Sequence, residues 1–242
     1  MRTRTFQIGE RVILRRRRKR VGARVTQVDR WMRRVVTDLG ERRLVHARTL
    51  GYPDNEIFLM LEARLDRSLR SSRGQGPFIQ ELLAGYDARL LYERVHTRED
   101  LRRFLRHEGR LPNVRMIHFC GHGHREGTFS LTFEDIRLEE NFDLFEGLAG
   151  KVVLFSSCEI GSLSETLQRL VDATGLAAVI AYRTEVQDTY ANLADAMIYD
   201  RLLTSGATPR QIVKHVNAAL KSLGARPLRR SRVREPVLRC FD

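Results

Sequence analysis

His122 and Cys158 each stand directly after an apolar run of the sequence. His122 follows MIHFCG at residues 116–121, and Cys158 follows VVLFSS at residues 152–157. A thiol becomes an effective nucleophile when a neighbouring imidazole removes its proton, so one cysteine and one histidine are the minimum set for this chemistry. The sequence therefore predicts a cysteine nucleophile at position 158 with His122 as its general base.

Both apolar runs have the composition of buried parallel strands. Neither run alternates apolar and polar residues, so we expect both faces of the sheet to be covered. In such sheets, ligands and reactive groups gather beyond the carboxyl ends of the strands. The 36 residues that separate His122 from Cys158 leave room for a crossover between neighbouring strands. Because neighbouring strands lie about 4.8 Å apart, the two side chains can come within reach of each other.

The residues next to this pair supply further chemistry. Gly121 and Gly123 flank His122 and allow a close approach of the backbone to a substrate. The N–H groups of Gly123 and Cys158 are candidates to stabilise a developing oxyanion. A helix is predicted after Cys158, and its dipole would favour the thiolate if its N-terminus pointed at the sulfur. No Asp or Glu is an obvious third member of the group.

The sequence around the pair alternates between strand and helix patterns. Strands are predicted at residues 88–95, 114–120, 151–155 and 176–182. Helices are predicted to begin at Thr97, after a capping box at 162–165, at Asp188, and after Thr208. Gly175 and Gly224 are predicted to end two of them. This order predicts an α/β fold, with a mostly parallel sheet and helices on both faces.

A different pattern occupies the N-terminal part of the chain. Residues 6–50 contain four or five short segments with the period-two alternation of strands that have one exposed face. The segments IGERV, VGARVTQV and VVTDLGERRLV resemble those of SH3-like and Tudor-like barrels. We therefore expect a small all-β SH3-like barrel over residues 1–52, in front of the α/β domain.

Residues 53–77 are predicted to connect the two domains. Apolar residues at positions 57, 60, 61, 65 and 69 follow Asp54 with helical spacing, which indicates a helix. The segment SSRGQGP at residues 71–77 then breaks any regular pattern. We therefore place the domain boundary there, and the α/β domain at residues 78–242.

The positive charge of the chain is concentrated near its N-terminus. The formal net charge is +13, and residues 1–75 contain 20 Arg or Lys against 8 Asp or Glu, whereas the rest contains 23 against 22. A basic run at a predicted hairpin tip is either a solvated loop or a contact for an anionic partner, such as nucleic acid or a regulatory protein. The run consists of Arg15, Arg16, Arg17, Arg18, Lys19 and Arg20.

Cysteine content and hydropathy indicate the cellular compartment that we expect for this protein. The three cysteines show no CxxC spacing, so we expect no disulfide framework and favour a reducing cytoplasm. No apolar run approaches the about 18 residues that a membrane span needs. The first residues, MRTRT, lead into no apolar segment, so we expect neither a signal peptide nor contact with a membrane.

The segments HFCGHG and VVLFSSCEIG together resemble the histidine and cysteine motifs of caspase-like cysteine peptidases, particularly their bacterial CHAT-type branch. The resemblance covers roughly residues 78–224. It implies a caspase-like fold and peptide-bond hydrolysis through an acyl-enzyme, without metal or cofactor. It also implies a regulated bacterial protease that acts in antiviral (anti-phage) defence or in stress. By motif, His122 is the base, Cys158 is the nucleophile, and the N–H groups of Gly123 and Cys158 form the oxyanion hole. The short insert between the motifs, the missing tetratricopeptide repeats and the N-terminal barrel depart from the family.

The same resemblance implies that the side chain before the scissile bond enters a pocket built partly from residues 181–188. That segment, AYRTEVQD, contains Glu185 and Asp188 against a single Arg183. Two carboxylates favour a substrate with Arg or Lys at this position, because a cation relieves an unpaired buried charge. The alternative is that Asp188 only caps the helix that follows.

Other readings of the motifs remain. His118, Cys120, His122 and His124 alternate and could present metal ligands, but only His215 lies downstream among the histidines. The glycines around His122 lead into a strand pattern, which disfavours a nucleotide-binding loop, and no GxSxG occurs. The main alternative is a catalytically inactive nucleic-acid-binding or scaffold protein with a basic β-barrel.

Overall fold

The chain forms two compact units, Met1–Glu56 and Ile57–Asp242. We describe each unit by itself. The structure is a computed structural model. It describes residues 11–16, 19–28, 32–37, 40–46, 50–51, 57–64, 74–86, 88–205, 207–224 and 236–242.

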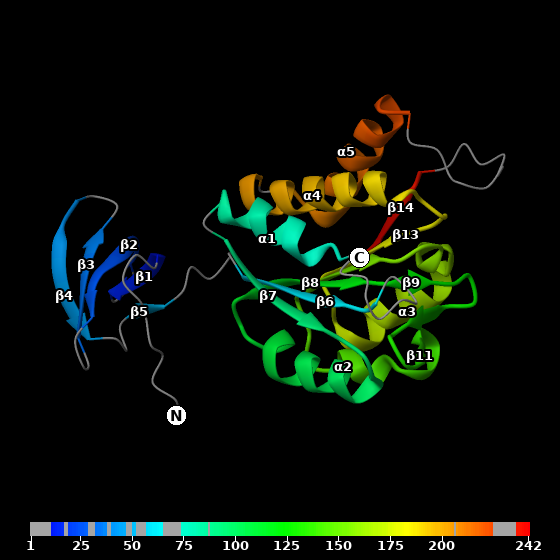
Figure 1. The fold of residues 1–242 in the computed structure, drawn as a ribbon, viewed down its shortest axis with the longest axis horizontal. Coiled ribbons are helices and arrows are strands. Elements are labelled where there is room, and N and C mark those ends of the chain that lie inside the picture. Colours follow the sequence, from blue (N-terminus) through cyan, green and yellow to red (C-terminus); the bar gives the residue numbers. More distant parts are fainter. Residues whose placement is uncertain are drawn as a thin grey trace. The chain divides into compact units, whose positions relative to one another are not determined.

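The N-terminal unit is a five-stranded antiparallel sheet (Figure 1). Its strand order is β4-β3-β2-β1-β5. Ala23, Val25 and Val35 are buried, whereas Thr26 and Arg34 are exposed, as the alternation of the sequence predicted. A small all-β unit at the front of the chain is therefore confirmed. Its strands are β1 (Arg11–Arg16), β2 (Lys19–Val28), β3 (Met32–Thr37), β4 (Arg42–His46) and β5 (Leu50–Gly51).

The second unit is built on a six-stranded sheet. The strand order is β14-β13-β12-β8-β6-β7, and only β14 runs antiparallel to its neighbour. The predicted mostly parallel sheet is confirmed. Its strands are β6 (Ile57–Glu62), β7 (Arg89–Arg94), β8 (Val114–Cys120), β12 (Val152–Ser156), β13 (Ala178–Tyr182) and β14 (Leu238–Phe241).

Strand β6 corrects the sequence prediction for residues 53–77. The predicted helix is wrong for Ile57–Glu62, which pair with β7 on one side and β8 on the other. All six side chains are buried, so the run IFLMLE carries no alternation that could distinguish a central strand from a helix. The compact second unit therefore begins at Ile57 rather than at residue 78. Asp54, Leu65 and Leu69 lie outside the described residues.

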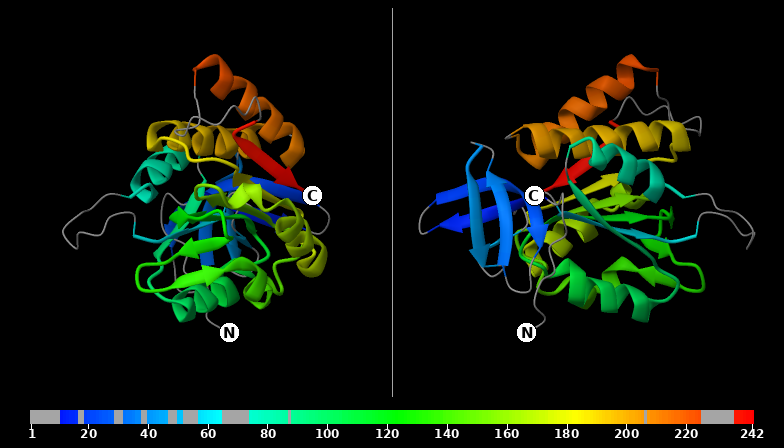
Figure 2. Two further views of the ribbon diagram at one scale, coloured as in Figure 1. Left: turned by 90° about the vertical axis from the view of Figure 1, so that its right-hand side faces the viewer. Right: turned by 60° about the vertical axis from the view of Figure 1, so that its left-hand side comes forward.

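Helices cover both faces of the sheet (Figures 1 and 2). One face carries α1 (Gly76–Ala84), α4 (Asp188–Thr204) and α5 (Pro209–Ser222), and the other carries α2 (Arg98–Phe104) and α3 (Ser164–Thr174). None of the described helices is long and apolar enough to cross a membrane.

The predicted helix ends are mostly confirmed. Capping boxes start α2 at Thr97 and α5 at Thr208, and Gly175 ends α3 with a left-handed conformation at φ 69°. The predicted capping box at 162–165 is wrong, because α3 starts at Ser164 behind a 3₁₀ turn, Ile160–Ser162, and no side chain caps it. The chain between β8 and β12 forms a small sheet of β9 (His122–Gly123), β10 (Thr128–Ser130) and β11 (Asp135–Arg137).

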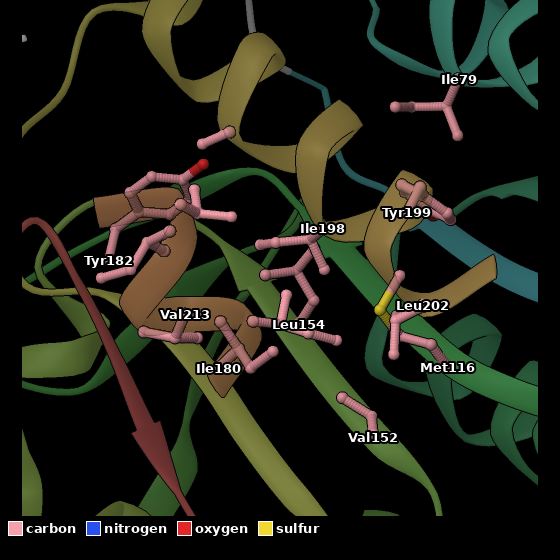
Figure 3. Packing of buried hydrophobic residues seen from close by; sticks show 14 of the residues in the cluster. Ile79, Met116, Val152, Leu154, Ile180, Tyr182, Ile198, Tyr199, Leu202 and Val213 are labelled. Carbon is pink, nitrogen blue, oxygen red and sulfur yellow. The ribbon is translucent and has the colours of Figure 1, made fainter. Parts of the chain in front are cut away.

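The core lies between the sheet and its helices. Figure 3 shows Leu154 and Ile180 of the sheet against Ile198 of α4 and Val213 of α5. On the opposite face, four phenylalanine rings form a cluster with centroid separations from 5.0 to 6.3 Å. These rings belong to Phe119, Phe129, Phe145 and Phe155. Both faces of β8 and β12 are therefore fixed by packing, which holds their ends in place.

Truncation of a core leucine tests this packing. Leu154 is 0% exposed, so we expect Leu154→Ala to lower the free energy of unfolding by about 2–5 kcal/mol through lost burial and a cavity. Leu223→Ala is the matched control, because Leu223 is 52% exposed and should lose less than about 0.5 kcal/mol. Urea unfolding measures both variants. Equal stability of the two would contradict the assigned core.

Candidate active site

Sheet register brings the two predicted catalytic residues together. Strands β8 and β12 are parallel neighbours, and Cys120 pairs with Ser156 in their last described rung. His122 and Cys158 therefore each lie two residues beyond the same rung. Both residues line two cavities, of about 160 Å³ and about 530 Å³. His122 is exposed and Cys158 is partly buried, so the thiol lies at a solvent-accessible edge of the sheet.

Gly123 lies directly against the cysteine segment. A Cβ atom at this position would lie 2.5 Å from the carbonyl oxygen of Cys158 and 2.9 Å from Cβ of Ser157. Only glycine fits so close to another backbone. Pairing of Gly123 with Phe129 in β10 fixes this approach. The role of the Gly123 N–H in an oxyanion hole stays a prediction.

The chain turns sharply after Cys158. Glu159 has φ 64°, and it is the one non-glycine residue with positive φ among the described residues. The N–H of Ile160 donates to the carbonyl oxygen of Cys158 at 2.9 Å, which closes the turn. A left-handed non-glycine residue is unfavourable, and such residues cluster at functional sites. Helix α3 begins only at Ser164, so the predicted helix does not follow Cys158 directly.

Electrostatics favour the protonated thiol of Cys158. Burial raises its pKa above the ordinary value, and the nearby carboxylates of Glu185 and Glu159 raise the pKa further. A hydrogen bond from the backbone N–H of Val186 opposes these effects. The pKa of Cys158 is therefore raised overall, whereas the dipole of a helix N-terminus would lower it. A base must therefore remove the proton before the sulfur can attack.

The two predicted substrate-binding carboxylates line different cavities. Asp188 lines the smaller one and Glu185 lines the larger one. Asp188 is the first residue of α4, whose N-cap is Gln187, so Asp188 is not the N-cap. Arg183 is not among the described lining residues of either cavity. The carboxylates thus lie beside the thiol, and their role in substrate binding stays a prediction.

A buried carboxylate that the sequence reasoning missed lies behind the smaller cavity. Asp195 of α4 is 0% exposed. Ser156 Oγ donates to its Oδ2 at 2.6 Å and Gln75 Nε2 donates to the same oxygen at 2.8 Å. Tyr182 Oη donates to Oδ1 at 2.8 Å. Asp195 therefore connects α4, the residue before α1, and the ends of β12 and β13.

A second buried carboxylate, Glu62, ends strand β6. It is 3% exposed and accepts hydrogen bonds from the backbone N–H of Gln75 at 2.5 Å and from Tyr92 Oη. Burial and Glu62 raise the pKa of Tyr92 to about 12. Burial, followed by Glu62, also raises the pKa of Cys120 well above its usual range. Cys120 is therefore a protonated thiol, unlike a reactive cysteine.

The alternating histidines of the first motif lie in different surroundings. His118 is 0% exposed, with Nδ1 3.1 Å from Tyr199 Oη and Nε2 3.5 Å from Asp195 Oδ2. Burial lowers the pKa of His118 although Asp195 and Glu62 oppose this effect. His122 and His124 are exposed. Within the part of the chain that the structure describes, no group of three or more His, Cys, Asp or Glu side chains could hold a metal ion.

The predicted basic run lies in the N-terminal unit. Strands β1 and β2 pair Arg15 with Arg20 and Arg16 with Lys19. Arg17 and Arg18 lie outside the described residues. The register places four of the six basic residues on two adjacent strands, and their contact with an anionic partner stays a prediction.

Comparison with known proteins finds similarity in structure only. No protein-family model matches the sequence, and no curated protein matches it. Among solved structures, the chain is similar to the Drosophila initiator caspase Dronc, with a TM-score of 0.50 and 10% sequence identity. The match covers 78% of this chain and 80% of the Dronc chain. The chain therefore has a caspase-like fold over most of its length.

The pH dependence of thiol reactivity tests the electrostatics of the site. Because Glu185 raises the pKa of Cys158, we expect Glu185→Gln to lower it. The alkylation rate of Cys158 by iodoacetamide should rise with pH as the thiolate forms, and the variant's curve should lie at lower pH than the wild-type curve. Glu165→Gln, an exposed change on α3, is the control with the same loss of charge. A curve that is unchanged or shifted to higher pH would contradict the assignment.

Proposed function

We propose that this chain is a cysteine endopeptidase in which His122 and Cys158 hydrolyse peptide bonds through an acyl-enzyme. The observation that carries the proposal is the pair of cavities that both residues line, at the carboxyl ends of neighbouring parallel strands. This is where parallel sheets place reactive groups. The caspase-like fold supports the same reaction class.

The reaction follows from the groups at the site. His122 takes the proton of the Cys158 thiol, and the sulfur attacks the carbonyl carbon of the scissile bond. The N–H groups of Gly123 and Cys158 stabilise the negative oxygen of the tetrahedral intermediate. The carbon–nitrogen bond then breaks, and the imidazolium gives its proton to the leaving amine. His122 next activates a water molecule, which releases the peptide acid and restores the thiol. No step needs a metal or a cofactor.

The raised pKa of Cys158 supports a mechanism that depends on the base. With the thiol protonated at rest, attack on a carbonyl requires a proton acceptor close to the sulfur. His122 lines the same two cavities as Cys158.

Protein substrates follow from the reaction class. We further propose that the chain acts in regulated bacterial proteolysis, against phage or under stress, because its motifs resemble those of CHAT-type domains. We propose the cytoplasm as its location, because its three cysteines are free.

We also propose that the N-terminal unit contacts an anionic partner, which is a nucleic acid or an acidic regulatory protein. Besides the basic run, Arg34, Arg42 and Arg43 line a cavity of about 450 Å³ on this unit. Clustered arginines attract phosphates and carboxylates. If the site residues prove inactive, this binding function remains as the alternative, with the second unit as a scaffold.

Substitution of either catalytic residue tests the peptidase. We expect Cys158→Ala and His122→Ala each to reduce peptide cleavage by at least about 1,000-fold. Stability should change little, because both residues lie beyond the ends of β8 and β12 and neither is fully buried. Cys240→Ala, which removes a thiol outside the two cavities, should keep full activity. Cleavage of a peptide library and mass spectrometry of an electrophilic peptide probe on Cys158 provide the readouts. Activity retained in Cys158→Ala would refute the mechanism.

Salt titration tests the basic run. If it contacts phosphates, replacing residues 15–20 by serine should weaken nucleic-acid binding and reduce the slope of log K against log salt by about 0.9 per lost contact. A control variant with Lys214→Ser and Lys221→Ser on α5 changes charge in the other unit. Fluorescence anisotropy with a labelled oligonucleotide measures binding. A wild-type affinity that does not depend on salt would remove the proposed contact.

A further inference from the structure

The small sheet of β9, β10 and β11 has an open edge within the part of the chain that the structure describes. Strand β11 pairs with β10 on one side, and no described strand pairs with its other side. In Figure 1, β11 and α2 lie on the side of the large sheet away from α4 and α5. A cavity of about 450 Å³ adjoins β11, with Arg98 at the start of α2 also in its lining. None of its described lining residues also lines a cavity beside Cys158.

The register shows which backbone groups of β11 face outward. The N–H of Leu138 donates to the carbonyl oxygen of Gly127 at 3.0 Å, so these two residues form a hydrogen-bonded pair next to β11. Hydrogen-bonded and non-bonded pairs alternate along antiparallel strands, so Arg137 and Asp135 direct their N–H and C=O groups away from β10. The C=O of Arg137 accepts from Asn141 Nδ2 at 2.7 Å. The other outward groups have no bond to a described residue and can pair with an added strand.

Two buried polar atoms of the cavity lining have no partner. Asn141 is 6% exposed, and its Oδ1 has no hydrogen-bond partner among the described residues. Nε of Arg98 is also buried and has none either. Unsatisfied buried groups are costly, and a ligand that supplies the missing partners removes this cost. A peptide backbone offers both a donor and an acceptor, whereas a metal cation could contact only the oxygen.

The charge beside this edge is mostly negative. Residues 134–143 contain five carboxylates and one basic residue. Both guanidinium groups of the lining already have an acidic neighbour, at 3.4 Å for Arg137 and Glu140 and at 3.8 Å for Arg98 and Asp143. Asp135 and Glu139 are exposed and form no ion pair with a described residue. A basic partner therefore complements this surface.

An exposed aromatic ring lies in the turn between β10 and β11. Phe133 is 73% exposed. Its N–H donates to the carbonyl oxygen of His96 at 3.0 Å, and its ring lies 5.8 Å from the ring of His96. The turn is thus held in place while the ring faces solvent. Aromatic side chains of this kind are enriched in protein interfaces and often carry much of the binding energy.

We propose that the open edge of β11 binds an extended basic segment of a second protein, which adds to the small sheet as a fourth strand. Backbone pairing with Asp135 and Arg137 supplies affinity, as in other complexes formed by strand addition. The carboxylates and Phe133 select basic and apolar side chains. This binding does not depend on the peptidase function proposed above, because none of these residues lines a cavity beside Cys158.

The second protein is a regulator, because the small sheet carries the predicted base. Strand β9 consists of His122 and Gly123, and it pairs only with β10 among the described strands. The three strands have two or three residues each, and such small sheets are marginally stable by themselves. An added strand on β11 therefore stabilises the segment that holds His122.

Nuclear magnetic resonance with a model peptide tests the pairing. The probe is a short acetylated and amidated peptide that alternates Lys and Val, and the protein is the full chain with Cys158→Ala, which prevents cleavage. We expect saturable shifts of the Asp135 and Arg137 amide signals, with roughly 10-fold weaker binding when Glu replaces Lys. Methylation of every backbone nitrogen of the peptide removes its donors but keeps its charges, and should abolish binding. No saturation at about millimolar peptide, or equal binding of the methylated peptide, would overturn the proposal.

Matched variants separate backbone pairing from charge. Asp135→Pro removes an outward N–H at a strand edge, where proline is tolerated, and should abolish binding. Asp135→Asn keeps the N–H and should weaken binding only about 3-fold, with Asp172→Asn on α3 as the unaffected control. Phe133→Ser should weaken binding by about 10-fold, whereas Leu223→Ser, also an exposed apolar position, should not. Circular dichroism checks the fold, and Phe133→Ser and Asp135→Asn decide the matter if Asp135→Pro does not fold.

Hydrogen exchange and light scattering distinguish the remaining outcomes. Bound peptide should slow exchange of the Gly123 amide, because β10 connects it to β11; unchanged exchange would overturn the regulatory role. A second copy of this chain is the competing occupant. A mass that rises with concentration for the chain alone, and no longer does so in Asp135→Pro, would assign the edge to self-association and overturn the proposed partner. Failure of the peptidase would leave all these binding results unaffected, since they are measured on Cys158→Ala.

Discussion

The register between β8 and β12 is the constraint on which the site depends. Cys120 lies opposite Ser156, so β8 and β12 end at the same position along the sheet. His122 and Cys158 therefore each lie two residues beyond this pair. Side chains alternate between the faces of a sheet, so a slip by one residue would turn the last residues of a strand to the opposite face. The phenylalanine cluster on one face and Leu154 against α4 on the other exclude such a slip. The predicted catalytic pair is therefore positioned by core packing.

The buried carboxylates join this core to the cavity. An unpaired charge in the interior is strongly unfavourable, and the donors around Asp195 and Glu62 remove most of that cost. Those donors come from the ends of β12 and β13 and from Gln75 before α1, so satisfying the charge also fixes the cavity wall. The hydrogen bonds that stabilise the buried charge of Asp195 therefore also shape the cavity beside Cys158.

The sequence predicted the strands whose apolar runs end in small or polar turn residues, and the helices that begin with a cap. Strands β8 and β12, and the helices that start at Thr97 and Thr208, are confirmed. Strand β6 was mistaken for a helix because burial on both faces removes the alternation that identifies strands. Asp195 was missed although it stands four residues before Tyr199 and three before Ile198 on the buried face of α4. A lone acid among apolar helix positions signals a buried carboxylate, but its partners lie far away in sequence.

The charges beside Cys158 favour its protonated thiol. Burial raises the pKa of Cys158, and the carboxylates of Glu185 and Glu159 raise it further. Together they keep the thiol protonated in the free protein. With the thiol protonated at rest, the proposed mechanism requires a proton transfer to a base as the sulfur attacks. A positive charge close to the sulfur would oppose these carboxylates, because an opposite charge favours the ionised form. The reactivity of Cys158 therefore depends on what its carboxylate neighbours and any nearby base do to its proton, and less on the sulfur alone.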